Sequence, residues 1–409
     1  MRFATSARRW QHAPASPIPR RTSTSWQWHG RACCPPGRRR ARAARTSSTG
    51  RPTAGCSRRR CKSRRLEPDA MDLARLLPAV THQARSTCST RGFTLIELMV
   101  AMAIALLVLG GIAMVFAGTS RNRGDLERSS RLAENAHFAL GLLSDELRVA
   151  GYFAEMSFVG VAWQTPDPCA TTLANLGWSS APFTAPVSLT AYMSTDATPA
   201  CVTNRKVGTP ILVARRVAVD PTPPANATTD AYLQVSKCAA DPKPWVVSNQ
   251  PADFTLRDLD CATVADVRRL MVRLYYVATC DDCGVDAIPT LKRSDLINGA
   301  FIVTPLVEGV ENLQLEYGFD ADNDGFPDQF LAAPDATLGP AYGEWSNVMA
   351  ARFYVLLRST DAQPGYQDTT KSFNLGLAGY TNPANDGYRR ALMTSVVRLN
   401  NPAGQRETP

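Results

Sequence analysis

The stretch RGFTLIELMVAMAIALLVLGGIAMVFAG, residues 91–118, decides how the rest of this chain is organised. It opens with a basic residue and a glycine, and a single acid, Glu97, lies near its start. The 21 residues that follow Glu97, up to Gly118, carry no charge. An apolar run of about 18 residues or more is typical of a membrane-spanning helix. A lone carboxylate in such a run is costly in lipid, so Glu97 is a candidate functional residue.

A second helical segment of different character follows the apolar run. Between residues 125 and 152, apolar residues recur at spacings of three and four, with polar residues between them. This spacing predicts an amphipathic helix with one buried face, formed by Leu132, Ala136, Leu140, Leu143 and Leu147. We therefore expect one helical arm, membrane-spanning at 93–118 and amphipathic at 119–153, with Gly151 as its stop signal.

The length of this arm constrains the rest of the chain. About 60 helical residues span about 90 Å, and the bilayer takes up about 30 Å of that length. The outer part of the helix must therefore project from the membrane and carry residues 154–409 as a headgroup. Such a helix can leave the lipid only where other apolar helices replace it.

The residues around Glu97 resemble the processing site of type IV prepilins and of the related pseudopilins of type II secretion. The resemblance rests on GFTLIE at 92–97 and on the long apolar run behind it. It implies that a membrane-embedded peptidase cuts between Gly92 and Phe93 and methylates the new N-terminus at Phe93. Glu97 then becomes the fifth residue of the mature chain. The alternative is an ordinary signal-anchor whose acid has no role.

Two further stretches resemble the minor pilins of PilW type. One is RLAEN at 131–135 followed by DELRVAGY at 145–152, and the other is RRALMTSVVRLN at 389–400, which resembles a closing strand of those proteins. His137 departs from the pattern, since the family often has Arg there. The residues before Tyr152 also fit a plain helix C-terminus, in which Gly151 ends the helix.

Charge is distributed unevenly along the 409 residues. The net charge of the whole chain is +9, but residues 1–92 hold 21 Lys and Arg and only three acids. Residues 93–409 therefore carry 24 basic and 33 acidic residues. A basic protein would suggest a nucleic-acid partner, but the part expected to do the work is acidic. We therefore expect no direct binding to nucleic acid.

The front of the chain has no sign of a folded core. Residues 1–70 are rich in Arg, Pro, Ser and Thr and have no apolar periodicity. This composition predicts a disordered basic extension. The alternative is that translation starts at Met71, so that residues 1–70 are not part of the natural protein. Residues 71–92 then form a prepilin leader. Because Arg85 and Arg91 precede the apolar run, the positive-inside rule keeps that side cytoplasmic and exports the headgroup.

Strand signals dominate the headgroup. Runs rich in Val, Leu, Tyr and Phe between turn residues predict antiparallel strands: 211–214, 232–235, 270–278, 301–303, 310–319, 350–358 and 392–399. Residues 154–265 are otherwise expected to be loops and short strands. The predicted fold class is α+β, with a long N-terminal transmembrane and amphipathic helix packed on an antiparallel sheet headgroup, as in type IV pilins.

Six cysteines follow Gly92, and an exported domain can oxidise them. They allow 15 pairings, among which we expect the sequential one, Cys169–Cys201, Cys238–Cys261 and Cys280–Cys283. The last pair could also be redox-active. Its two intervening aspartates would raise the thiol pKa, and Pro289 argues against a following helix, so a structural disulfide is favoured.

An aspartate-rich loop at 320–328, DADNDGFPD, is the sharpest candidate metal site. Carboxylates at positions 1, 3, 5 and 9, with glycine at position 6, resemble part of a calcium loop, which makes Asp320, Asp322, Asp324 and Asp328 possible Ca²⁺ ligands. Leu331 stands where an EF-hand has its bidentate Glu, and no flanking helices are evident. A solvated Asp-Gly hairpin turn is the alternative.

Residues for catalysis are scarce in the headgroup. His137, on the helical arm, is the one histidine after Gly92, so the headgroup offers neither a Ser-His-Asp triad nor a His-based zinc site. It also contains neither a P-loop nor a GxSxG motif. We expect a protein that is not an enzyme.

The resemblance implies a minor pilin that is cleaved, N-methylated and assembled at or near the tip of a type IV pilus, where it primes assembly. Its partners would be other minor and major pilins, the prepilin peptidase, the assembly platform and the membrane. It would reside in the inner membrane as a single-pass protein with a periplasmic headgroup, and later in the pilus. A minor pseudopilin of type II secretion and a signal-anchored periplasmic binding or enzymatic domain are the alternatives.

Overall fold

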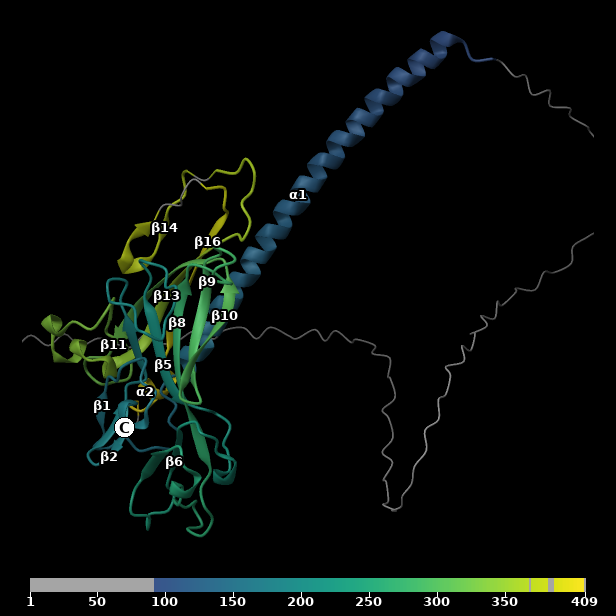
Figure 1. Ribbon diagram of the computed structural model, residues 1–409. Helices are drawn as coiled ribbons and strands as arrows, with labels where there is room; N and C mark the ends of the chain where they lie inside the picture. The colour runs from purple at the N-terminus through teal and green to yellow at the C-terminus, as the bar shows by residue number, and fades with distance from the viewer. Residues whose placement is uncertain (1–91, 368, 382–385, 408–409) are drawn as a thin grey trace, which may run out of the picture. The chain divides into compact units, whose positions relative to one another are not determined.

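The computed structural model describes residues 92–367, 369–381 and 386–407 (Figure 1). The extension expected at 1–70, the leader residues before Gly92 and the possible start at Met71 lie outside the described residues. Within them, one helix leads into a β-rich headgroup, which confirms the predicted α+β class. The sheets are antiparallel apart from one short parallel pair.

Helix α1 runs without interruption from Leu95 to Val149, 55 residues. It begins at a capping box: the Thr94 hydroxyl accepts from the backbone N–H of Glu97, and the Glu97 carboxylate accepts from the N–H of Thr94. Such reciprocal caps satisfy two N–H groups that a helix start leaves unpaired. The helix ends before the expected residue 153. Gly151 has φ +74°, and its N–H donates to the backbone carbonyl of Arg215 on β5 (Ile211–Val217) instead of continuing the helix.

Four strands form a sheet in the order β12-β11-β13-β16. Their bounds are Gln329–Leu331, Val310–Phe319, Val348–Arg358 and Arg390–Arg398. A short helix α2, Asn400–Gly404, follows the last strand. The predicted strand at 310–319 is confirmed at both ends, and those at 350–358 and 392–399 differ from the observed strands by one or two residues.

A second sheet has the order β10-β9-β8-β5-β4, with β6 pairing β8 and β7 pairing β6. The bounds in chain order are β4 Leu189–Tyr192, β5 Ile211–Val217, β6 Tyr232–Val235, β7 Trp245–Ser248, β8 Val267–Ala278, β9 Thr290–Ile297 and β10 Ala300–Glu308. The sequence did not predict β9. Its charged residues Lys292, Arg293 and Asp295 hide the strand pattern, although Lys292 and Asp295 are buried.

Short elements complete the headgroup. Strands β1 Ala162–Gln164, β2 Ser179–Ser180 and β3 Phe183–Pro186 form one small sheet, and β14 Phe373–Asn374 pairs with β15 Tyr380–Thr381. Single-turn 3-10 helices lie in the loops at Leu173–Asn175, Pro224–Asn226, Pro251–Asp253, Ala336–Leu338, Pro340–Gly343, Trp345–Asn347 and Gly376–Ala378. The sequence suggested a single sheet on the helix, and the structure instead divides the strands among several.

The long strands β5 and β8 face two different hydrophobic cores. Side chains alternate between the faces of a strand, so Leu212 and Tyr275 enter a helix core that also contains Leu143 and Leu147 of α1. Their neighbours enter an outer core around Phe153, Trp178 and Trp245. Helix α1 contacts β16, β13, β10 and β5. The outer half of α1 is therefore anchored to both large sheets.

Candidate functional site

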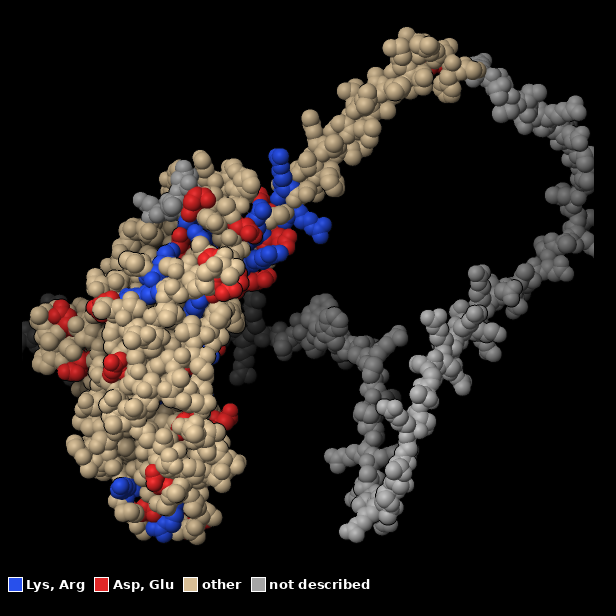
Figure 2. All heavy atoms as spheres, in the orientation of Figure 1, with Lys and Arg blue, Asp and Glu red and all other residues tan. Residues whose placement is uncertain are grey.

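The N-terminal half of α1 is an apolar surface that no described part of the chain covers. The most apolar 18-residue segment of α1 has a mean hydropathy of 2.7, and none of its residues is buried. Leu107 and Met114 are 77% and 80% exposed. Among the described residues, α1 alone is long and apolar enough to cross a membrane. Figure 2 shows this part of the helix almost free of charge, while basic and acidic residues gather where α1 meets the headgroup.

The expected processing and assembly residues lie together at the start of this surface. Gly92 and Phe93 precede the helix, and the Phe93 side chain is 87% exposed. A Cβ added at Gly92 would meet nothing within 4 Å, so the folded chain itself does not require glycine there. Within the described part of the chain, the Glu97 carboxylate accepts hydrogen bonds from Thr94, and both residues are exposed. Glu97 is therefore available to another chain once its cap is given up.

The outer half of α1 carries a buried acid that the sequence did not single out. Glu146, 6% exposed, accepts from Arg216 Nε at 2.9 Å and from Arg273 Nη1 at 2.6 Å. Arg273 Nε in turn lies 2.8 Å from Asp295 Oδ1 on β9. This network ties the helix to three adjacent strands of the second sheet. The sequence signal was an acid next to the apolar stripe, between Leu143 and Leu147.

Electrostatics keep Glu146 ionised in this position. Burial alone would raise the pKa of its carboxyl group, but the hydrogen bonds and charges of Arg216 and Arg273 outweigh burial and hold the pKa below its ordinary value. The guanidinium groups also satisfy both carboxylate oxygens, as a buried charge requires. The headgroup is thereby joined to α1 by ion pairs as well as by apolar packing.

The aspartate loop joins β11 to β12, so it lies in a hairpin without flanking helices. Asp320 is fully buried and accepts from the N–H groups of Asn323 and Gly325, at 2.7 and 3.0 Å. Arg406 Nη1 also lies 3.0 Å from its carboxylate. The aspartate therefore already has a cationic partner within the chain.

The structure brings three of the four predicted calcium ligands together. Oxygens of Asp320, Asp322 and Asp328 lie within 4.8 Å of one another, and Asp324 is not in this group. Desolvation and the neighbouring carboxylates raise the pKa of Asp322. Asp328 accepts from the N–H of Ala321, at 2.7 Å. Calcium binding here stays a prediction, since the same contacts also close a hairpin turn.

The cysteines are joined in the sequential pattern. Disulfides link Cys169 to Cys201, Cys238 to Cys261 and Cys280 to Cys283. The first closes the segment around β1–β3 against the loop before β5, and the second closes the loop between β6 and β8. Because residues 154–265 contain few long strands, these cross-links restrict a region that is otherwise held by its loops and by the outer core.

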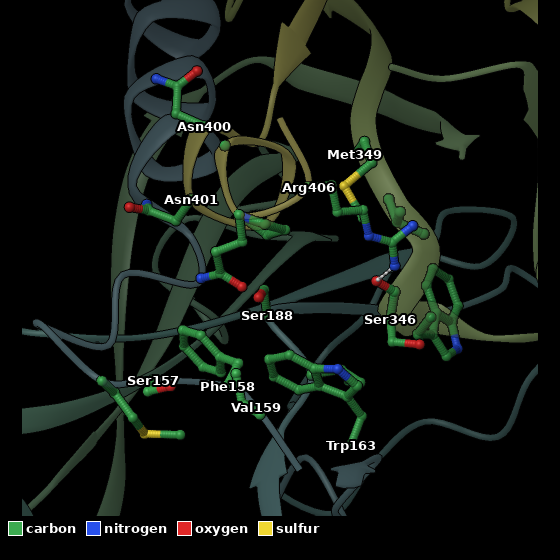
Figure 3. Close-up of a pocket in the computed structure, with 17 residues that line it drawn as sticks. Ser157, Phe158, Val159, Trp163, Ser188, Ser346, Met349, Asn400, Asn401 and Arg406 are labelled. Carbon is green, nitrogen blue, oxygen red and sulfur yellow. Dashed lines mark hydrogen bonds between the residues drawn. The ribbon is translucent and has the colours of Figure 1, made fainter. Parts of the chain in front are cut away.

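A cavity of about 720 Å³ lies between residues 156–159, which follow α1, helix α2 and the loop before β13 (Figure 3). Phe158 stacks on Trp163 on one side, with ring centroids 5.3 Å apart, and Trp345 lines another side. Arg406 is already bound to Asp320 and to the carbonyl of Ser346. No His, Cys, Asp or Glu is among the described residues that line it.

Comparison with known proteins gives two matches in different parts of the chain. Residues 88–113 match the model of the prokaryotic N-terminal methylation motif. The matched range includes Gly92, Phe93 and Glu97. Residues 274–401 match the model of the type IV pilus-assembly protein W family, from the second half of β8 to the start of α2. No match was found among curated proteins.

Among solved structures, the chain is similar to a type IV-like pilin from Thermus thermophilus. The two are 13% identical, with 66% of this chain and 97% of the other covered, and the TM-score is 0.28. A score that low supports no conclusion about this chain.

Proposed function

We propose that this chain is a minor pilin. Its resemblance to type IV prepilins of the PilW family is confirmed by both family matches. The observation that carries the proposal is the contrast within α1. Its first half is uncovered and apolar, whereas its second half is locked into the headgroup. A continuous helix of about 80 Å can be held first in lipid and then among the helices of a filament, carrying the headgroup with it.

Processing is the first step of the proposed function. Peptidase cleavage after Gly92 would expose Phe93 as the N-methylated first residue. Among the described residues, nothing would meet a Cβ added at Gly92. This supports the role, because a glycine that packing does not require can serve an enzyme that needs a small residue at the cut. Mass spectrometry of the native N-terminus tests it. A chain that starts at methyl-Phe93 supports the filament role, and an uncut chain or a cut elsewhere favours a signal-anchored domain.

Glu97 is the proposed docking residue for assembly. In a dry filament core, its carboxylate would pair with the methylated amine of Phe93 on a neighbouring subunit, and this attraction would offset the burial of both charges. We expect Glu97→Ala to be cleaved normally but to be missing from sheared pili. Glu134→Ala, an exposed acid on the same helix, is the control and should enter pili. Normal recovery of Glu97→Ala in pili would overturn this role.

The finer proposal is that the protein acts in priming assembly at or near the pilus tip. A priming subunit is needed in few copies, so its deletion should lower the number of pili while labelling finds it only at filament ends. Labelling along the whole filament would contradict a tip role. Loss of secretion with normal pili would favour the pseudopilin alternative.

The proposed location follows the same scheme. The basic residues before the apolar run and three disulfides in the headgroup support an inner-membrane protein with a periplasmic headgroup. Protease added to spheroplasts should then remove the headgroup, whereas protection would contradict the orientation. Other pilins, the peptidase and the assembly platform are the proposed partners.

A further inference from the structure

The disulfide between Cys280 and Cys283 differs from the other two in position and exposure. It lies in the loop between β8 and β9, and its cysteines are three residues apart, against 32 and 23 for the other pairs. Cys280 is 6% exposed, whereas Cys283 is exposed to solvent. One sulfur of this bond can therefore be reached from outside, and the other is shielded.

A buried lysine faces the exposed sulfur. Lys292, on β9, is 7% exposed, and its ammonium lies 3.4 Å from Cys283 Sγ. The same ammonium donates to the carbonyl of Asp281 at 2.8 Å. No ion pair joins Lys292 to a carboxylate within the described part of the chain. Its charge therefore acts within the disulfide loop, where it also helps to lower the pKa of the Asp286 carboxyl group.

The acids of the loop are arranged differently from what the sequence suggested. Asp286 accepts from the N–H groups of Asp281, Asp282 and Ile288, which lower the pKa of its carboxyl group. The side chain of Asp282 is exposed, so water screens its charge. Lys292 is buried and adjacent to the sulfur, where a charge acts more strongly. The cation therefore has the larger influence on Cys283.

We propose that Cys280–Cys283 is a thiol–disulfide exchange site, at which Lys292 stabilises the thiolate of Cys283. The thiolate is the reactive form of cysteine, and a nearby positive charge favours it. A stabilised thiolate makes the reduced form more favourable, so this disulfide is easier to reduce than the other two. This inference departs from the expectation of a purely structural bond and does not depend on the pilin role.

The reaction is a two-step exchange with a dithiol. A thiolate of the dithiol attacks Cys283 Sγ, the Cys280–Cys283 bond breaks, and Cys280 leaves as a thiolate that takes up a proton. The Thr279 hydroxyl lies 3.7 Å from Cys280 Sγ and can donate to it. The second thiol of the dithiol then attacks the mixed disulfide and releases Cys283 as a thiolate beside Lys292. Two electrons pass to the protein, and the dithiol becomes a disulfide.

Opening this bond is expected to have a local effect. Strands β8 and β9 remain paired from Arg273–Asp295 to Ala278–Thr290, so the hairpin does not depend on the disulfide. The loop also contacts the first sheet, where Arg358 donates to the carbonyl of Ala287 at 3.2 Å. Reduction would therefore change the loop and this contact without unfolding the headgroup.

The test is redox titration of the full chain in detergent, in dithiothreitol buffers of defined potential, with alkylation and mass spectrometry of each cysteine. The other two disulfides serve as internal controls. We expect Cys280 and Cys283 to be reduced first, while circular dichroism still shows a folded headgroup. Simultaneous reduction of all three pairs, or reduction only on unfolding, would overturn the proposal.

Variants at Lys292 test the role of its charge. We expect Lys292→Met to lower the equilibrium constant for reduction about tenfold, equivalent to about 30 mV for two electrons. Lys292→Arg should retain most of the wild-type value, because the charge remains. Lys243→Met, at an exposed lysine, should change nothing. An unchanged constant in a folded Lys292→Met protein would overturn the role of Lys292. If that variant fails to fold, the thiol pKa of Cys283 is measured in the reduced wild-type protein instead. A value at or above the ordinary one of about 8.5 would overturn the role of Lys292.

Discussion

The two halves of α1 share one helical conformation, but their sequences and surroundings differ. Leu107 in the first half is 77% exposed, and Leu143 in the second half is 1% exposed. The first half is uniformly apolar, so no face of it is suited to water and its partner must come from outside the chain. The second half has one apolar face and a buried acid, Glu146, so the headgroup itself is its partner. Because α1 is one continuous helix, it connects the half that needs an outside partner to the half that the headgroup covers.

The largest expected effect on stability comes from Glu146. Glu146→Ala leaves the largely shielded Arg216 without its acid and leaves Arg273 with Asp295 alone, which costs about 3–5 kcal/mol of unfolding free energy. Urea denaturation of the full chain in detergent, followed by tryptophan fluorescence, measures the loss. Glu127→Ala, which removes an exposed pair with Arg131, is the matched control and should be nearly neutral. An equal effect of the two substitutions would contradict an anchoring role for Glu146.

A leucine in each half of α1 gives the next comparison. Leu143→Ala should destabilise the headgroup by about 2–5 kcal/mol, because it leaves a cavity in the helix core. Leu107→Ala should leave headgroup stability unchanged in the same denaturation measurement, since no described residue packs on that side chain. Its effect should appear as lower recovery in sheared pili. A large loss of headgroup stability in Leu107→Ala would show that the first half has a partner within the chain.

The pH dependence of stability should also depend on Glu146. Because its folded-state pKa lies below the ordinary value of 4.5, its contribution is present above that value and is lost as pH falls through the folded pKa. Unfolding free energies measured between about pH 5 and pH 3 should therefore decrease more steeply for wild type than for Glu146→Gln. Parallel curves for the two proteins would mean that the carboxyl group has the same pKa folded and unfolded.

The smallest expected effect concerns calcium. We expect a chelator to lower the melting temperature of the full chain only slightly, because Arg406 already neutralises part of the charge of Asp320. Asp322→Asn should abolish that response if Asp322 is a ligand, while Asp361→Asn, at an exposed acid of another loop, should retain it. An unchanged melting temperature on chelation would count against a calcium site.

Much of the fold follows from local patterns, and the misses have physical causes. Strands β6 and β11 match the predicted bounds because apolar and aromatic residues recur along both of them. Strand β9 was missed because it carries three charged residues. One of them, Asp295, is paired with Arg273 on β8, and such pairing cannot be read from one strand alone. The same limitation applies to the site: Glu146 needs Arg216 and Arg273, which lie 70 and 127 residues away along the chain.

The sequence by itself determined the apolar run, the position of Gly92, Phe93 and Glu97, and the continuation into an amphipathic helix. These depend on composition and on spacing over a few residues, which act locally. The tertiary structure alone decided that Glu146 anchors the helix, that Arg406 binds the aspartate loop and that Lys292 faces Cys283. Each of these is an interaction between distant segments, and burial sets its strength by removing the water that would otherwise screen the charge.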